Sequence, residues 1–275
     1  MRQLTTLTSA LLDPLMAADP VGPRITYYDD ATGERIELST VTLANWAAKT
    51  GNLLRDELGA GPGSRVAVLL PAHWQTAAVL FGIWWIGAEV VLDGTSADLG
   101  LCTAGRLAEA DDAVGAGEIA VLSLDPFGKP VADLPVGVTD YATAVRVHGD
   151  QISPERNPGL ALDGRAVADV LADARTSAAR QGFTAGDRVM SMAGWDDADE
   201  LIDHLAAVFA IGASLVQVAN PDPTALDTTP VFTTPPGPPA HAGAASATAH
   251  SSPADTPRIH TIVPPAEGYL GAASG

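Results

Sequence analysis

In the first third of the chain, a short β-branched run is followed by a long apolar segment and then by a second short run. Residues 66–70 are apolar throughout, as in a strand that is buried on both faces. Pro71 ends this strand, and residues 73–86 are long and apolar enough for a buried helix that Gly87 would end. Residues 88–92 then predict a second strand. Strand, helix and strand with short connections form a βαβ unit, which predicts a parallel sheet.

The same pattern returns in the second half of the chain. Residues 186–192 (Gly-Asp-Arg-Val-Met-Ser-Met) repeat the pattern of residues 63–69 (Gly-Ser-Arg-Val-Ala-Val-Leu), and residues 211–216 repeat that of residues 86–91. Helical segments precede the two copies at residues 43–58 and 166–181. The sequence therefore predicts an α/β fold with two pseudo-repeated βαβ-type halves and largely parallel sheets.

The folded part of the chain is expected to span residues 1–218. Leucines recur at helical spacing within residues 1–18, which predicts an amphipathic helix there. The two halves would cover about residues 20–148 and 149–218. Eleven of the 21 prolines lie beyond residue 218, among Ala, Ser, Thr and Gly. Such a composition buries too little apolar surface to offset the entropy of ordering, so residues 219–275 are predicted to be a disordered tail.

Charge and cysteine content narrow the classes of function. The formal net charge is −18, which argues against nucleic acids and anionic membranes as partners, because both require basic surface. The most apolar segment, residues 77–88, is shorter than the roughly 20 residues that a membrane-spanning helix needs. Cys102 is the only cysteine, so an intramolecular disulfide and a cysteine-based zinc site are excluded. We expect a cytoplasmic protein, because the N-terminus also lacks a signal-peptide pattern.

Three segments carry a family resemblance: residues 39–43, residues 63–71 with their Arg-Val-Ala-Val core, and residues 86–92 with Gly-Ala-Glu-Val-Val. Over about residues 20–218 the chain resembles the N-terminal part of the adenylate-forming superfamily, which includes the AMP-binding and acyl-CoA synthetase-like enzymes. It is most similar to the short, uncharacterised AMP-binding-like proteins of high-GC Gram-positive bacteria. The resemblance implies the fold of the N-terminal domain of adenylate-forming enzymes.

The resemblance also implies where ATP would bind, and there the sequence departs from the family. By chain order, the family's Ser/Thr/Gly-rich phosphate loop corresponds to residues 150–159. Two prolines there donate no N–H group, two carboxylates would repel a triphosphate, and Arg156 is the only cation. The chain has no lysine after Lys129, so the catalytic lysine of the family's C-terminal domain has no counterpart. The family's adenine-binding motif has no counterpart either. We therefore expect no cofactor, neither ATP nor AMP, and no ligase activity.

Five residues at strand ends or in adjoining loops are candidates for ligand contact: Pro71, His73, His148, Asp150 and Trp195. Open α/β sheets bind ligands at the carboxyl ends of their strands, which favours Pro71 and His73. His148 and Asp150 flank the degenerate loop. The resemblance places Trp195 near the family's acyl pocket. Each has a structural alternative. In that alternative, His73 serves only to begin a helix and Trp195 serves only as a packing residue in the core. No catalytic residue is expected.

Two further patterns have a functional and a structural interpretation. Acidic residues and His204 fall within two helical turns after Trp195, where Glu200 and His204 could share a divalent ion. The alternative, which we adopt, is an acidic first turn that complements the helix dipole, with His204 solvated and no metal. Trp84 and Trp85 lie on the most apolar helix, where core packing is the expected role and an exposed interface is the alternative.

Three functions remain open. The favoured one is a degenerate AMP-binding-like domain, a pseudoenzyme that binds a small molecule or a protein partner. The second is an ATP-dependent acyl-adenylate or acyl-CoA ligase whose site is rearranged or completed by another chain. The third is an interaction or scaffold protein. A concave pocket near His148 and Trp195 would favour the first over the third.

Overall fold

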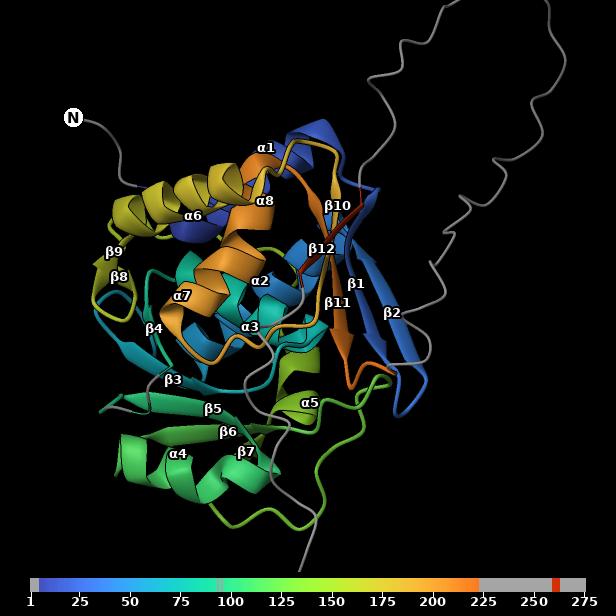
Figure 1. Cartoon of the computed structure of the whole chain (residues 1–275). Helices are drawn as coiled ribbons and strands as arrows, with labels where there is room; N and C mark the ends of the chain where they lie inside the picture. Colours follow the sequence, from blue (N-terminus) through green and yellow to red (C-terminus); the bar gives the residue numbers. More distant parts are fainter. Residues whose placement is uncertain (1–4, 93, 95, 223–258, 263–275) are drawn as a thin grey trace, which may run out of the picture.

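Two β-sheets organise the computed structural model, which describes residues 5–92, 94, 96–222 and 259–262 (Figure 1). The first sheet has the order β12-β10-β11-β1-β2. Its strands are Ile259–Ile262 (β12), Arg188–Ser191 (β10), Ser214–Ala219 (β11), Pro23–Asp29 (β1) and Glu34–Ser39 (β2). Only the β1–β2 hairpin is antiparallel, and the other three pairs are parallel.

The second sheet has the order β7-β6-β5-β3-β4-β8-β9. Its strands are Val138–Asp140 (β7), Glu118–Leu122 (β6), Leu99–Thr103 (β5), Arg65–Leu69 (β3), Glu89–Val91 (β4), Leu160–Leu162 (β8) and Arg165–Ala166 (β9). All its pairs are parallel except β8–β9. The prediction of an α/β fold with largely parallel sheets is confirmed.

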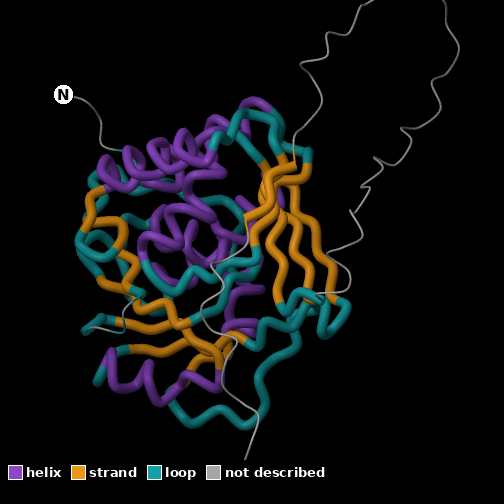
Figure 2. Tube along the Cα trace, in the orientation of Figure 1, coloured by secondary structure: helices purple, strands orange, loops and turns teal. Residues whose placement is uncertain are grey.

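Helices fill the space between the two sheets, and one helix covers the outer face of the second sheet (Figure 2). The α-helices are Leu7–Ala18 (α1), Thr40–Asp56 (α2), Trp74–Trp85 (α3), Leu107–Val114 (α4), Tyr141–Ala144 (α5), Val167–Gln181 (α6), Ala198–Leu201 (α7) and Ala207–Ile211 (α8). Two 3₁₀ turns, Ala104–Arg106 (η1) and Val145–Val147 (η2), and one π-helical segment, Ile202–Ala206 (η3), complete them. Helices α2 and α3 lie between the sheets, and α4 covers the opposite face of the second sheet (Figure 1).

The predicted pseudo-repeat is present in the element order. Helix α2 precedes β3-α3-β4, and helix α6 precedes β10, the helical segments α7, η3 and α8, and then β11. In both units the two strands are parallel neighbours. Each sheet nevertheless contains strands from both parts of the sequence. Strands β1 and β2 join the second unit's sheet, while β8 and β9 join the first unit's sheet. The two sheets therefore do not separate at residue 148.

Several stretches differ from what the sequence indicated. Strands β5, β7 and β8 were not expected, because they are short and β5 contains a glycine. Ile259–Ile262, within the predicted disordered tail, forms β12 and pairs with β10. Ala219, which was predicted to begin the tail, is instead the last residue of β11. The rest of the predicted tail lies outside the described residues, apart from residues 220–222.

The main core lies between the sheets and is built around α3, all of whose residues are buried. Trp84 and Trp85 are 2% and 9% exposed, so their packing role is confirmed and an exposed interface at these rings is excluded. Helix α1 contributes Leu7, Leu11 and Leu12, as its predicted amphipathic pattern requires. A second apolar cluster joins the outer face of the second sheet to α4.

Helices α2 and α3 approach most closely at Gly51 and Gly82. A Cβ atom on Gly82 would lie 2.8 Å from the backbone oxygen of Ala47 and 3.0 Å from the backbone nitrogen of Gly51. We expect Gly82→Ala to lower the free energy of unfolding by about 1–3 kcal/mol, although alanine favours a helix by about 1 kcal/mol. Urea denaturation would measure the change. Gly105→Ala is the control, because no atom lies within 4 Å of its added Cβ, and equal effects of both substitutions would refute the steric argument.

Candidate functional site

A cavity of about 820 Å³ opens where strands of both sheets end. Strands β1 and β11 reach it at Asp29 and Asn220, the segment after β3 supplies Pro71 and His73, and the segment after β6 supplies Leu124. The turn between β1 and β2 closes one side. The carboxyl ends of parallel strands are where open α/β sheets bind ligands. Here the ends of two sheets face a common cavity, which makes it the candidate functional site.

His73 is the residue that joins the cavity to the core. It caps α3, since its Nδ1 accepts a hydrogen bond of 3.1 Å from the backbone N–H of Gln75. The neutral ring therefore carries its proton on Nε2, which lies 3.6 Å from Glu34 Oε1. Its ring also meets the Tyr27 ring edge-on, at 4.3 Å between centroids. Burial lowers the pKa of His73 to about 4, against a smaller opposing effect of Asp29, so the imidazole is neutral at pH 7.

The charged groups of the cavity are mostly acidic and mostly engaged. Burial raises the pKa of Glu34, whose Oε1 accepts a hydrogen bond from Trp74 Nε1 at 3.3 Å. Asp29 Oδ1 accepts hydrogen bonds from the Asn220 amide at 3.0 Å and from the Ala31 backbone. Arg35 is the only cation that lines the described cavity, and it bonds to Tyr28 and pairs with Glu37. The cavity can thus accept polar groups, but it presents no unpaired cation to a phosphate.

The structure brings together only two of the five predicted ligand-contacting residues. Pro71 and His73 both line the cavity, Pro71 exposed and His73 buried. His148 lies away from it and pairs with Glu57 through Nε2, at 3.1 Å from Oε2. Asp150 is exposed in the following loop. Trp195 is 2% exposed and belongs to the main core, so the packing alternative describes it better.

The loop that chain order matches to a phosphate loop, residues 150–159, lies at the far end of α3. Its Glu155 N–H donates to the Trp85 carbonyl and its Gly159 N–H to the Gly87 carbonyl. Two more of its N–H groups donate to the Glu155 carboxylate. Trp85 ends the helix that His73 caps, so about 18 Å of helix separates this loop from the cavity. Chain order alone suggested that His148 and Asp150 contact a ligand, and neither residue lines this cavity.

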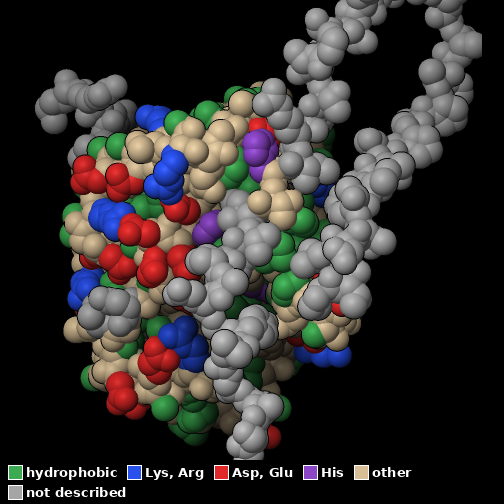
Figure 3. Space-filling view, viewed as in Figure 1, with side chains coloured by type: hydrophobic (Ala, Val, Ile, Leu, Met, Phe, Trp, Pro, Cys, Tyr) green, Lys and Arg blue, Asp and Glu red, His purple; other side chains and the backbone are tan. Residues whose placement is uncertain are grey.

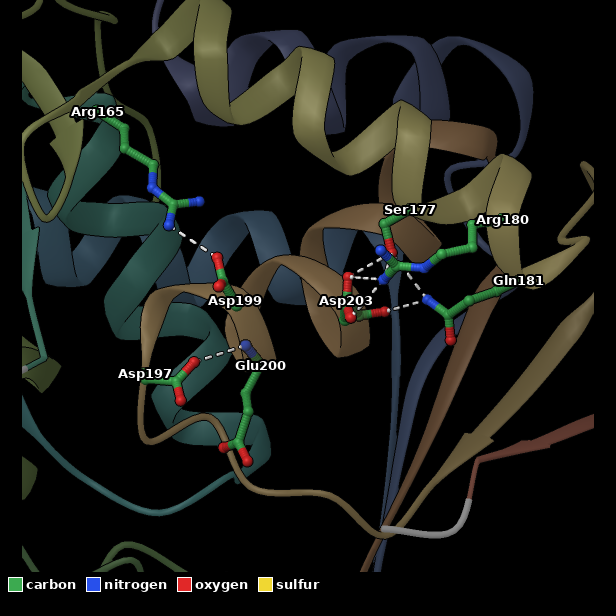
Figure 4. A network of polar contacts seen from close by, with 8 residues as sticks. All are labelled: Arg165, Ser177, Arg180, Gln181, Asp197, Asp199, Glu200 and Asp203. Carbon is green, nitrogen blue, oxygen red and sulfur yellow. Dashed lines mark hydrogen bonds and ion pairs between the residues drawn. The ribbon is translucent and has the colours of Figure 1, made fainter. Parts of the chain in front are cut away.

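The acidic segment after Trp195 forms a network of ion pairs and hydrogen bonds with β9 and α6 (Figure 4). Arg165 pairs with Asp199 at 2.7 Å, and Arg180 pairs with Asp203 at 2.6 Å. Acidic and basic side chains intermingle on this face of the molecule (Figure 3). Among the described residues, no group of three or more His, Cys, Asp or Glu side chains could hold a metal ion.

His204 differs from its expected solvated state. It lies in the π-helical segment, is partly buried, and burial lowers its pKa.

Asp29, Glu34 and Asn220 are among the cavity residues that the sequence did not predict. Asp29 and Glu34 stand at the two ends of a turn. Acidic residues are common at turns for structural reasons, so the sequence did not mark them as functional. Asn220 follows the last strand of the second repeat, at the point where the tail was expected to begin. The strand-end rule applied to β1 and β11 could have found Asp29 and Asn220.

The fold is that of a class of α/β protein which includes solved structures of acyl-CoA and aryl-CoA ligases. The chain superposes on an acyl-CoA synthetase of Brucella canis with a TM-score of 0.66 and 20% identity, over 79% of this chain and 43% of that one. The anthranilate CoA ligase AuaEII, solved with anthranoyl-AMP, gives a TM-score of 0.62 and 15% identity over 78% and 45%. A benzoate CoA ligase from Burkholderia xenovorans LB400 gives 0.62 and 16% over 82% and 47%.

These identities establish the fold alone, and the chain spans less than half the length of these three structures. The predicted resemblance to the N-terminal part of the AMP-binding superfamily is confirmed at that level. No family model matches the chain. Over 226 residues it is 72% identical to the TIGR03089 family protein of Mycobacterium tuberculosis (strain ATCC 25618 / H37Rv), covering 81% of this chain and 93% of that protein. The chain therefore belongs to the TIGR03089 family.

None of the described helices has the length and apolar character that crossing a membrane requires.

Proposed function

We propose that this chain is a degenerate AMP-binding-like domain that binds a small molecule in the central cavity and forms no adenylate. The observation that carries the proposal is the cavity itself, which lies at the carboxyl ends of strands from both sheets. Its volume of about 820 Å³ lies within the range of small-molecule sites. A buried neutral imidazole and a carboxyl group of raised pKa face each other there, an arrangement that is common at functional sites.

Two features argue against adenylation. Phosphate-binding loops offer free backbone N–H groups and a cation. In residues 150–159, by contrast, four backbone N–H groups already donate hydrogen bonds to other groups of the protein. The cavity has Asp29 and Glu34 but only the engaged Arg35, so a triphosphate would meet net negative charge. Both features support binding without ATP chemistry.

The first test is ATP–pyrophosphate exchange with Mg²⁺ and a panel of carboxylic acids. The panel should include anthranilate and benzoate, the acids named for two structural neighbours. We expect no exchange above the protein-free rate, together with no calorimetric binding of ATP or AMP at millimolar concentration. Exchange that depends on one acid would overturn the proposal and favour a ligase with a rearranged site.

The second test concerns the cavity. Small molecules that raise the melting temperature of the wild type should lose that effect in Ile36→Trp, because Ile36 lines the cavity and a larger ring would fill part of it. Val21→Trp is the matched control, since Val21 is 78% exposed and does not line the cavity. A ligand that stabilises both variants equally would bind elsewhere, and the proposal would then fail for this cavity.

A further inference from the structure

A second, smaller pocket adjoins the central cavity and has a different chemical character. Its volume is about 190 Å³, and it lies between α2, α3, the loop after β6, and the α5–η2 segment. Four aromatic side chains line it: Trp46, Trp74, Phe127 and Tyr141. Pro126 and Phe127 line both the pocket and the central cavity, so the two spaces share one wall.

The aromatic walls are fixed in place by contacts with one another and with the core behind them. Trp46 and Trp74 meet edge to face, with 6.0 Å between ring centroids. The Tyr141 hydroxyl shares a hydrogen bond of 2.6 Å with Thr50 Oγ1, and the tyrosine is 3% exposed. Because these rings are held before any ligand arrives, binding would order few side chains and would cost little entropy.

The fourth wall, Phe127, is held by its backbone while its ring stays 83% exposed. Asp125 Oδ1 accepts hydrogen bonds from the N–H groups of Phe127 at 2.8 Å and Lys129 at 3.3 Å. Arg146 donates to the carbonyls of Phe127 and Gly128. A large ring that is exposed on a pinned loop, beside an aromatic pocket, is the kind of apolar surface that marks a binding site.

One acceptor within the pocket is available to a ligand. The Gln75 side chain is 8% exposed, and its Nε2 donates to the Asp125 carbonyl at 3.1 Å. Within the described part of the chain, its Oε1 accepts no hydrogen bond, although Gln75 lines the pocket. The two charged groups of the lining, Asp125 and Arg146, have opposite signs and are both engaged by the loop. The pocket therefore favours a neutral ligand with a single donor.

We propose that this pocket binds a neutral monocyclic aromatic compound that carries one hydroxyl or amino group. A cavity of about 150 Å³ holds benzene in other proteins, so about 190 Å³ fits one ring with a small substituent. Aromatic walls favour an aromatic guest through offset and edge-to-face contacts. The donor group of the guest would bond to Gln75 Oε1. The inference goes beyond the proposed function and uses residues that do not line the central cavity, apart from the shared wall.

Ligand-observed saturation-transfer NMR on the full chain, with phenol, toluene, cyclohexanol and benzoate, would test this proposal. We expect saturable phenol binding that is tighter than that of the other three compounds. Phe127→Ala removes one exposed wall and should weaken phenol binding by about fivefold. Gln75→Met keeps the volume but removes the acceptor, so the preference for phenol over toluene should disappear.

Filling the pocket supplies a matched pair of variants on one helix. Ala142 lines the pocket, whereas Ala144 does not. Ala142→Leu should weaken phenol binding by about tenfold or more, and Ala144→Leu should leave it within about twofold. If Ala142→Leu does not fold, Phe127→Ala alone decides. Equal binding of cyclohexanol and phenol, tighter binding of benzoate, or phenol binding unchanged in Phe127→Ala would overturn the proposal. Such a failure would leave the test with Ile36→Trp unaffected, because Ile36 lines only the central cavity.

Discussion

Trp84→Ala is expected to lower the free energy of unfolding by about 3–5 kcal/mol, the range for removing a large buried ring. Trp84 is 2% exposed, and its ring meets Phe81 edge to face at 5.7 Å between centroids. Its Nε1 donates a hydrogen bond of 2.8 Å to the Ala161 carbonyl on β8. Substitution therefore leaves a cavity and removes this hydrogen bond from the core. Urea denaturation followed by tryptophan fluorescence would measure the loss.

Trp84→Phe separates the two contributions. It keeps an aromatic ring in the core but removes the donor and one ring of the indole, so we expect a smaller loss of about 1–3 kcal/mol. Trp46→Ala is the second comparison, because Trp46 is only partly buried and its loss should cost less than that of Trp84. If Trp84→Ala destabilised the chain no more than Trp46→Ala does, the central role of α3 in the core would be refuted.

Trp84 also explains why the chain folds as one unit although its sequence reads as two halves. It lies on α3 of the first repeat, yet its hydrogen-bond partner lies on β8, just before the long helix of the second repeat. The hairpin of β1 and β2 makes the reverse connection by joining β11. Because each half completes the other half's sheet, we expect a single cooperative unfolding transition.

The sequence predicted those elements whose own pattern is strong. The strand, helix and strand of β3, α3 and β4 are largely apolar, and Pro71 and Gly87 mark the ends of the first strand and of the helix. In the structure Ser39 caps α2, since its hydroxyl accepts a hydrogen bond from the Thr42 N–H at 3.2 Å. Strands of three residues such as β7 and β8 were missed, because a three-residue run has no periodicity of its own and forms only when a neighbouring strand pairs with it.

The sequence predicted only those site residues whose position follows from a single strand. Pro71 and His73 follow a strand that is recognisable by itself, so the strand-end rule found them. Glu34 and Asn220 come from the other sheet, and how two sheets face each other depends on packing that no local pattern encodes. His148 and Asp150 were inferred from chain order, but residues 150–159 dock on the carbonyls of Trp85 and Gly87 instead. Tertiary contacts thus brought Glu34 and Asn220 into the site and kept His148 and Asp150 out of it.

Acid should destabilise this protein through His73. The pKa of its buried imidazole is about 4 in the folded chain, below the 6.5 of an exposed histidine. Between these values the unfolded chain binds the extra proton and the folded chain does not, so stability falls as pH decreases from about 6.5 to 4. We expect a loss of about 3 kcal/mol at pH 4 relative to pH 7 from this group alone. Glu34 acts in the opposite direction, because a raised carboxyl pKa favours the folded state as pH falls.

His73→Asn isolates the contribution of the imidazole. Asparagine caps a helix as well as any residue and does not titrate, so α3 keeps its first turn and Glu34 stays in place. The difference in unfolding free energy between wild type and variant, measured in urea at pH 7, 5.5 and 4.5, should narrow steadily with acid. His148→Asn is the control, since His148 is not part of the cavity and pairs with Glu57. Parallel pH profiles for wild type and His73→Asn would show that the imidazole is not held neutral by burial. The cavity would then contain a histidinium at mildly acidic pH, beside Glu34 and Asp29, and could bind an anion there.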